Sequence, residues 1–235
     1  MNSSLKWLAN FAILQQQSCI ICQQNSRALI CQYCKEDLLL FDLPRCHYNL
    51  LNMPQVKRGL AVTTFTHLLA LADYQWPLAQ LVGGLKFSAK LQYSKALAEL
   101  FVGHCLCGNQ DHPQAILPIP LHSGRYISRK YNQSIEISKE ISRLSGIPLD
   151  LCILKRHKST DAQSALSATK RRTNLRNAFT VMAPIKYKHI ALFDDVLTTG
   201  ATMQSAYQLL KQQHPQMQID IWSVCLTLVH PQTPP

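Results

Sequence analysis

Apolar residues along this chain occur in two patterns, short β-rich runs and repeats at helical spacing. The short runs predict strands over residues 60–66, 115–120, 189–196 and 219–229, with a brief strand at 152–154. Helical spacing predicts helices over residues 76–101, 131–144 and 201–213, the first interrupted near Gly83 and Gly84. Because strands alternate with helices, the fold class is α/β, with a parallel sheet flanked by helices.

The first 55 residues do not follow this alternation. A short apolar stretch with a lone Lys6 is followed by Gln15, Gln16 and Gln17 where a signal peptide would have small residues, so an amphipathic leader helix is expected. Cysteine pairs and a turn-rich segment come next. We therefore expect a small N-terminal module over residues 1–55 and an α/β domain over residues 56–235.

Composition limits the class of protein. With 235 residues, 47% of them hydrophobic, the chain can build one medium domain and a small appendage. No run of 18 apolar residues occurs, so no membrane span is expected. Cysteines grouped in CxxC pairs suit metal binding in a reducing compartment.

Four cysteines form two CxxC pairs. They are Cys19, Cys22, Cys31 and Cys34, with two, eight and two residues in the successive gaps. Four thiolates favour tetrahedral Zn²⁺, which would stabilise a segment too small for its own core. Redox-active thiols and chance are the alternatives. Cys105, Cys107, Cys152 and Cys225 are scattered and are expected in the core.

Positive charge is concentrated in one segment. The net charge is +11, and residues 121–188 hold 14 Lys and Arg against four acids. Such a segment attracts phosphate, either on a small ligand or along nucleic acid. A solvated basic surface is the alternative.

A strand, two acids and a Thr-Gly turn follow one another near the C-terminus. Residues 190–193 are apolar, as a buried parallel strand requires, and Asp194 and Asp195 come at its carboxyl end, where α/β sheets bind ligands. Gly200 permits a left-handed turn, and the helix start adds backbone N–H donors. The predicted phosphate cradle comprises Val196, Leu197, Thr198, Thr199, Gly200, Ala201 and Thr202.

Carboxylates repel phosphate but accept hydrogen bonds from vicinal hydroxyls, so a phosphosugar fits this segment better than free phosphate. An acidic strand end capped by a Thr-rich turn is the alternative. The segment resembles the signature of type I phosphoribosyltransferases, which bind 5-phosphoribosyl-1-pyrophosphate (PRPP). The resemblance implies that Asp194 and Asp195 bind the ribose hydroxyls, that the loop binds the 5-phosphate, and that Mg²⁺ accompanies the pyrophosphate.

Pyrophosphate would need its own receptor. The loop after the strand at 115–120 offers Ser123, Gly124, Arg125 and Arg129, since arginine binds phosphate oxygens bidentately and glycine permits close backbone approach. Surface arginines are the alternative. Residues 155–177 are polar and basic, and their place in the chain corresponds to the flexible catalytic loop of type I enzymes. A basic linker is the other interpretation.

Several motifs in order narrow the resemblance. Pro118-Ile119-Pro120, the R-x-x-x-R-x-Y-N-Q run from Arg125, Leu85-Lys86-Phe87 and the R-R-x-N-L-R-x-A-F run from Arg171 accompany the paired acids. Together they resemble the ComF family of competence proteins over residues 19 to about 229. The resemblance implies a cytoplasmic role in natural transformation, in the uptake or processing of incoming single-stranded DNA.

Three functions stay open at this point. An active phosphoribosyltransferase would use Asp194, Asp195 and Arg125 as catalytic residues with PRPP and Mg²⁺. A binding protein would keep the PRPP cradle and hold single-stranded DNA, with competence proteins or a helicase as candidate partners and Tyr126, Tyr131 or Phe179 for base stacking. A zinc adaptor with a vestigial site is the third. The candidate nucleic-acid-binding residues are Lys130, Lys155, Arg156, Lys158, Arg171, Arg172 and Arg176.

Overall fold

The computed structural model describes residues 17–60, 64–88, 90–108, 111–121, 131–157 and 178–228. The predicted leader helix and most of the basic segment at 155–177 lie outside the described residues. The chain divides into two compact units, residues 1–39 and 40–235. Residues 40–55 belong to the larger unit, where the Phe41 N–H donates to the Leu71 carbonyl. The predicted boundary between residues 55 and 56 stays a prediction.

A four-stranded parallel sheet forms the centre of the larger unit. Its order is β3 (Leu68–Asp73), β8 (Gln218–Leu226), β7 (His189–Leu197) and β4 (Ala115–Pro118). Leu149 extends the far edge through a parallel bridge to Ile116. The predicted α/β class with a parallel sheet is confirmed.

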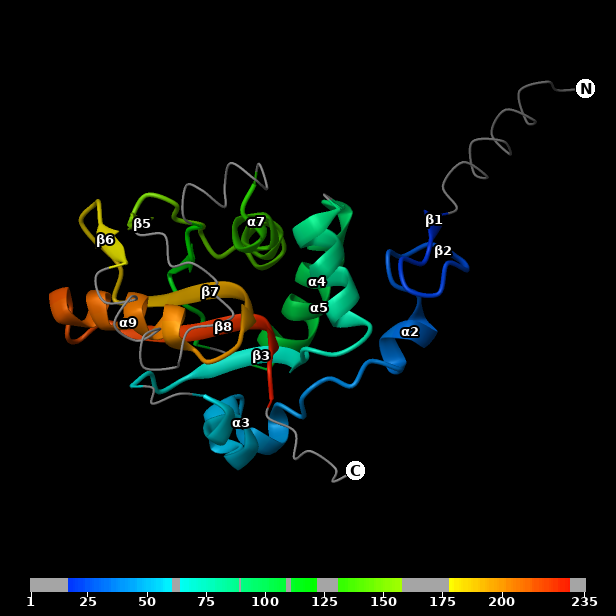
Figure 1. Cartoon of the computed structure of the whole chain (residues 1–235), viewed down its shortest axis with the longest axis horizontal. Coiled ribbons are helices and arrows are strands. Elements are labelled where there is room, and N and C mark those ends of the chain that lie inside the picture. The colour runs from blue at the N-terminus through cyan, green and yellow to red at the C-terminus, as the bar shows by residue number, and fades with distance from the viewer. Residues whose placement is uncertain are drawn as a thin grey trace, which may run out of the picture. The chain divides into compact units, whose positions relative to one another are not determined.

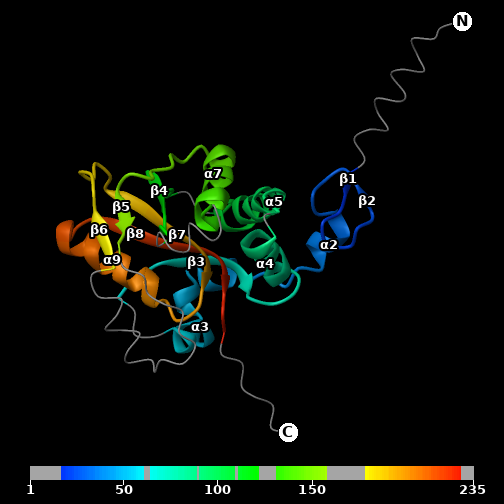
Figure 2. The same ribbon diagram turned by 45° about the horizontal axis from the view of Figure 1, so that its top comes forward.

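Helices cover both faces of this sheet. Figures 1 and 2 show α4 (Leu78–Phe87), α5 (Gln92–Phe101) and α7 (Gln133–Ser145) on one face, and α9 (Ala201–Gln213) on the other. A π-helical turn, η3 (Val102–Leu106), continues α5, and α3 (Pro54–Gly59) follows two short 3₁₀ turns, η1 (Pro44–Cys46) and η2 (Leu50–Asn52). A small antiparallel pair, β5 (Leu154–Arg156) and β6 (Phe179–Val181), stands apart from the sheet. Among the described residues, no helix combines the length and apolar character needed to cross a bilayer.

Aromatic rings hold the helices on the central strands. Phe101 of α5 contacts Phe193 of β7 edge to face, with ring centroids 5.8 Å apart, and lies 5.4 Å from the Trp222 ring of β8. All three side chains are fully buried. Burial of each such side chain contributes about 1.5–3 kcal/mol, so this cluster fixes β7, and the acids that it carries, against α5.

The strand predicted over residues 60–66 is wrong in position. Residues 64–66 belong to no strand, residues 61–63 lie outside the described residues, and the edge strand is β3. Its Leu and Ala residues have a weak intrinsic preference for strands, whereas the preceding Val and Thr have a strong one. Burial beside β8 therefore outweighs local propensity, because β3 is apolar along its whole length except for Asp73.

The helix break predicted near Gly83 and Gly84 is also wrong in position. Helix α4 runs through both glycines, and the chain leaves the helix at Ser88. A β-carbon at Gly84 would lie 2.5 Å from Cε2 of Tyr93 in α5. Gly84 thus permits close packing of two helices, which is a tertiary requirement that resembles a helix breaker in the sequence.

A buried carboxylate lies at the amino end of the sheet. Asp220 of β8 has its two oxygens 3.3 Å from Nδ1 of His67 and 3.0 Å from Nε2 of His189. Both imidazoles lie within ion-pair distance of this buried carboxylate, but His67 Nδ1, His189 Nε2 and Asp220 Oδ1 make no hydrogen bond among the described residues. This cluster lies at the opposite end of β7 from Asp194 and Asp195.

Candidate functional site

The four cysteines predicted to bind zinc converge in the small N-terminal unit. Their sulfurs all lie within 4.8 Å of one another. Strands β1 (Gln17–Ser18) and β2 (Asn25–Ser26) form a short hairpin that presents the first pair, and the second pair lies at the start of α2 (Gln32–Glu36). Sulfurs bound tetrahedrally at about 2.3 Å from one zinc would be about 3.8 Å apart, and Cys22 Sγ and Cys31 Sγ are 3.8 Å apart.

Electrostatics of the cluster also fit a cation. Burial raises the pKa of the Cys19 thiol, but N–H donors led by that of Cys31 outweigh it and lower this pKa to about 6. Burial, contacts with the other sulfurs and the charge of Cys19 raise the pKa of Cys34 to about 12. A second thiolate is therefore unfavourable without a cation, and a divalent ion would stabilise all four.

The other cysteines take no part in this cluster. Cys46 is buried, its thiol donates to the Leu43 carbonyl, and burial raises its pKa. Cys105 and Cys225 are buried core residues, as expected, whereas Cys107 and Cys152 are exposed, so their prediction as core residues is wrong.

The acid pair lies at the carboxyl end of β7, as predicted. The Asp195 side chain is largely buried, and Asp194 is partly covered. Asp194 Oδ1 accepts hydrogen bonds from Ser134 Oγ at 2.7 Å and from the Asp195 N–H at 2.9 Å. Asp195 Oδ2 lies 3.0 Å from Lys86 Nζ. Donors from α7 and α4 thus hold both carboxylates in place.

Further contacts tie the same three segments together. The Tyr131 hydroxyl donates to the Leu85 carbonyl, which joins the start of α7 to the end of α4. Asn132 caps α7 by accepting from the Ser134 N–H, and its amide donates to the Ile119 carbonyl after β4 at 2.9 Å. The Leu-Lys-Phe, Tyr-Asn-Gln-Ser and Asp-Asp motifs, far apart in the sequence, therefore meet at one edge of the sheet.

Sequence reasoning assigned no role to Lys86 or Ser134. Lys86 is the centre of the Leu-Lys-Phe motif, and Ser134 directly follows the Tyr-Asn-Gln end of the run from Arg125. Those motifs were the available signal. The contacts with the acids could not be inferred, because they depend on how α4 and α7 pack.

The predicted phosphate cradle forms the turn from β7 into α9. Gly200 has φ 74° and ψ −1°, the left-handed conformation that glycine favours, and it immediately precedes the 13-residue helix. The first N–H groups of a helix have no partner within it. Thr198 and Thr199 are exposed beside them. The turn therefore offers backbone and hydroxyl donors to an anion.

Burial and the neighbouring charge set the ionisation of Asp194. Burial and the Asp195 carboxylate raise the pKa of Asp194 to about 6, against the opposing effects of the Ser134 hydroxyl, the Lys86 charge and the Asp195 N–H. Burial, followed by the charge of Asp195, raises the pKa of Cys225 on β8 to about 12. The carboxyl end of β7 is thus a partly buried site that carries negative charge.

Most of the remaining predicted site residues cannot be compared with the acid pair, and only a few lie in the described part of the chain. Ser123, Gly124, Arg125, Arg129, Lys130, Lys158, Arg171, Arg172 and Arg176 lie outside the described residues, as does Tyr126. Lys155 is exposed on β5, and the Arg156 guanidinium lies 5.5 Å from the Phe179 ring centroid. Phe179 is 4% exposed, so its predicted availability for base stacking is wrong.

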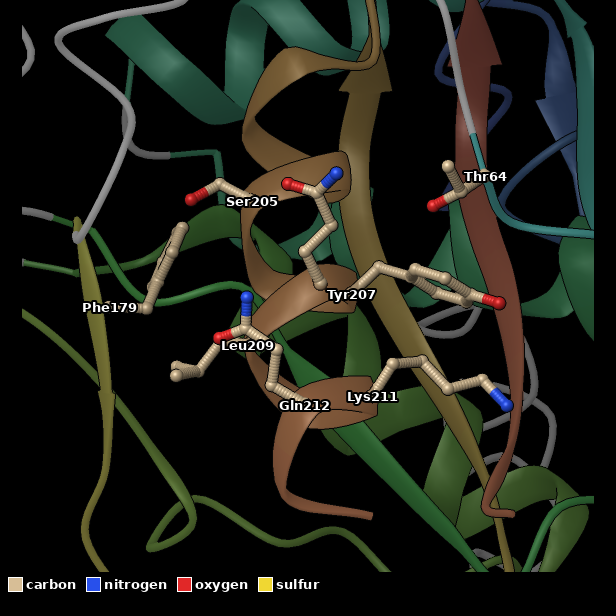
Figure 3. Close-up of a pocket in the computed structure, with 8 residues that line it drawn as sticks. Thr64, Phe179, Ser205, Tyr207, Leu209, Lys211 and Gln212 are labelled. Carbon is tan, nitrogen blue, oxygen red and sulfur yellow. The ribbon is translucent and has the colours of Figure 1, made fainter. Parts of the chain in front are cut away.

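A separate groove of about 550 Å³ runs along α9. Figure 3 shows Ser205, Leu209 and Gln212 of this helix beside Phe179, with Thr64 and Lys211 also in the lining. Its lining residues include neither the acid pair nor any residue of the phosphate cradle. We therefore assign no chemistry to it.

The cysteine cluster predicts a stoichiometric metal. We expect about one zinc per purified chain, and Cys31→Ser should lose most of it, because three sulfurs hold zinc far more weakly than four. Elemental analysis of both proteins measures this, with the exposed Cys152→Ser as the matched control. Equal zinc in wild type and Cys31→Ser would contradict the assignment.

The raised pKa of Asp194 predicts a pH-dependent cost in stability. A folded-state pKa of about 6, above the unfolded value, makes the folded protein relatively more stable at low pH and removes that advantage as pH rises through 6. Asp194→Asn keeps the acceptor without the charge, so it should raise the free energy of unfolding by about 2 kcal/mol at pH 7.5.

Denaturant unfolding between pH 4 and 8 measures this effect, with the exposed Asp42→Asn as control. The difference between Asp194→Asn and wild type should grow as pH rises through 6. A constant difference across this range would show that Asp194 ionises as it does in the unfolded chain.

Comparison with known proteins identifies relatives of almost the whole chain. No protein-family model matches the chain. DNA utilization protein YhgH of Escherichia coli K12 is 31% identical over 216 residues, which cover 89% of this chain and 90% of the relative. The protein of the same name from Salmonella typhimurium is 30% identical over 235 residues, covering 95% and 97%. Competence protein F of Haemophilus influenzae is 30% identical over 223 residues, covering 92% and 93%. Since these relatives match almost from end to end, the chain belongs to the ComF family of competence proteins.

Proposed function

We propose that this protein binds PRPP at the carboxyl edge of its central sheet and serves in the use of DNA taken up by the cell. One observation carries the ligand assignment. Three motifs from distant parts of the chain meet at the acid pair. There Ser134 donates a hydrogen bond to Asp194, and Lys86 forms an ion pair with Asp195. Two adjacent carboxylates, one buried and one partly covered, are unfavourable for folding alone, so a ligand explains them better than stability does.

The chemistry of the edge suits a phosphorylated pentose. The carboxylates accept hydrogen bonds from the vicinal hydroxyls, and the turn that begins with Thr198 and includes Gly200 offers N–H and hydroxyl donors to the 5-phosphate. The pyrophosphate would be bound by Ser123, Gly124, Arg125 and Arg129, with Mg²⁺ neutralising its charge. Zinc in the cysteine cluster would have a structural role.

Support for the DNA assignment comes from the relatives and from charge. The relatives are named for DNA utilization and for competence. The basic segment 121–188 carries enough positive charge to follow a single-stranded phosphate backbone, with Lys155 and Arg156 as its described candidates. We place this role in the cytoplasm, with DNA-processing proteins such as a helicase as candidate partners.

Transfer of the phosphoribosyl group is the second candidate function. Asp194 Oδ1 is already held by two donors, and such fixed polar groups are what an oxocarbenium-like transition state requires. None of the sequence motifs indicates a binding site for the substrate that would accept the phosphoribosyl group. Binding is therefore the primary proposal.

Calorimetric titration of PRPP with Mg²⁺ tests the ligand. Wild type should bind one PRPP per chain, and Asp194→Ala/Asp195→Ala should bind at least about 100-fold more weakly, because two hydrogen bonds to charged groups are lost. The control is Asp37→Ala/Asp42→Ala, which makes the same change in charge at exposed acids. Equal binding by wild type and the acid-pair variant would sink the assignment. Pyrophosphate release in the same samples would show transfer.

Salt dependence tests the DNA assignment. Affinity for single-stranded DNA should fall roughly 10- to 100-fold between low and physiological salt, since several lysines and arginines would release counterions. Lys155→Glu should weaken binding further and flatten this dependence, whereas Lys57→Glu, outside the basic segment, should not. Fluorescence anisotropy with a labelled oligonucleotide measures both. Identical binding by the two variants would exclude the β5 edge from the DNA site.

A further inference from the structure

Lys86 brings a positive charge into the acid pair. Its Nζ lies 3.0 Å from Asp195 Oδ2, and the two side chains are only 18% and 11% exposed. Among the described residues, Lys86 is the one lysine or arginine within 4.0 Å of either carboxylate. The Tyr131 hydroxyl binds the Leu85 carbonyl, so the backbone that carries Lys86 is anchored from α7. This cation is therefore a fixed part of the site.

The acid pair needs such a cation to receive a diol. A hydroxyl donates to an ionised carboxylate, but burial and mutual repulsion favour a proton on one of the two acids. The Lys86 charge opposes that effect. A divalent cation bound directly to the carboxylates would likewise favour their ionised form.

Direct binding of Mg²⁺ to both acids fits the observed contacts poorly. Asp195 Oδ2 is paired with Lys86, and Asp194 Oδ1 accepts two hydrogen bonds. Of the four carboxylate oxygens, Asp194 Oδ2 and Asp195 Oδ1 have no hydrogen-bond or ion-pair partner among the described residues. These are the oxygens that ribose hydroxyls would use. A metal ion on the acid pair would compete with both Lys86 and the sugar.

We propose that Lys86 is the resident cation of the acid pair, a positioning residue that keeps both carboxylates ready for the ribose hydroxyls. The ribose 5-phosphate part of the ligand then binds without a divalent cation, and Mg²⁺ acts only on the pyrophosphate. This inference depends on the proposed PRPP site and specifies how that site holds the sugar.

A purely structural role would give different results. If Lys86 served only to tie α4 to β7, its loss would lower stability but would leave the pH and metal dependence of ligand binding unchanged. Lys86→Met removes the charge at nearly constant length, and Lys86→Arg retains it. Lys90→Met, four residues further on, is the matched control, since Lys90 packs over the Tyr93 ring of α5 and forms no ion pair with either acid.

Calorimetric titration with ribose 5-phosphate and with PRPP, each in EDTA and in Mg²⁺, tests the proposal. Wild type should bind ribose 5-phosphate with a Kd that differs by less than about twofold between EDTA and Mg²⁺. Lys86→Met should bind it about tenfold more weakly at neutral pH, as for the loss of one charged contact. The ratio of its Kd to that of wild type should grow as pH falls toward 6, because its acids would then be protonated. Lys86→Arg and Lys90→Met should remain near wild type.

Three outcomes would overturn the proposal. Ribose 5-phosphate could bind wild type only with Mg²⁺, a comparison that needs no variant. Lys86→Met could match wild type in affinity and pH profile. Wild type could bind neither ligand in either buffer, which would remove the proposed PRPP site as well. PRPP binding that needs Mg²⁺, together with metal-independent binding of ribose 5-phosphate, would support both proposals.

Discussion

The repulsion between Asp194 and Asp195 is the constraint that organises the candidate site at the carboxyl end of the central sheet. Two adjacent carboxylates at a buried strand end are costly, and the cost falls only if donors and a cation surround them. Ser134 and Lys86 supply these, and both reach the acids from helices on one face of the sheet. The two carboxylates therefore depend on the packing of α4 and α7 over the carboxyl end of β7, because these helices carry the two partners.

The two ends of β7 use buried charge differently. At the amino end, His189 and His67 both lie within ion-pair distance of the buried Asp220 carboxylate. At the carboxyl end, one oxygen of each acid has a partner among the described residues, and the other oxygen has none there. Asp220 thus has both oxygens near protein side chains, whereas Asp194 and Asp195 each keep one oxygen that could accept a further hydrogen bond.

The small N-terminal unit is stabilised by different means. Its helix α2 has no buried residue, and its two strands are two residues long, so hydrophobic burial contributes little. Its four convergent sulfurs form a cluster that could hold a metal ion. The chain therefore combines a unit that carries a candidate metal centre with a unit built around apolar packing.

The sequence alone determined what depends on neighbouring residues. Spacing within the cysteine pairs predicted the cluster, and the run of β7, acids, Gly200 and α9 predicted the strand end and its turn, because these features are local. It misplaced β3 and misinterpreted Gly84, since both depend on distant partners. The contact of Ser134 with Asp194 joins residues 60 positions apart, and that of Lys86 with Asp195 spans more. Only tertiary packing could decide which helix donates to which carboxylate, because local propensity carries no information about the faces on which helices meet.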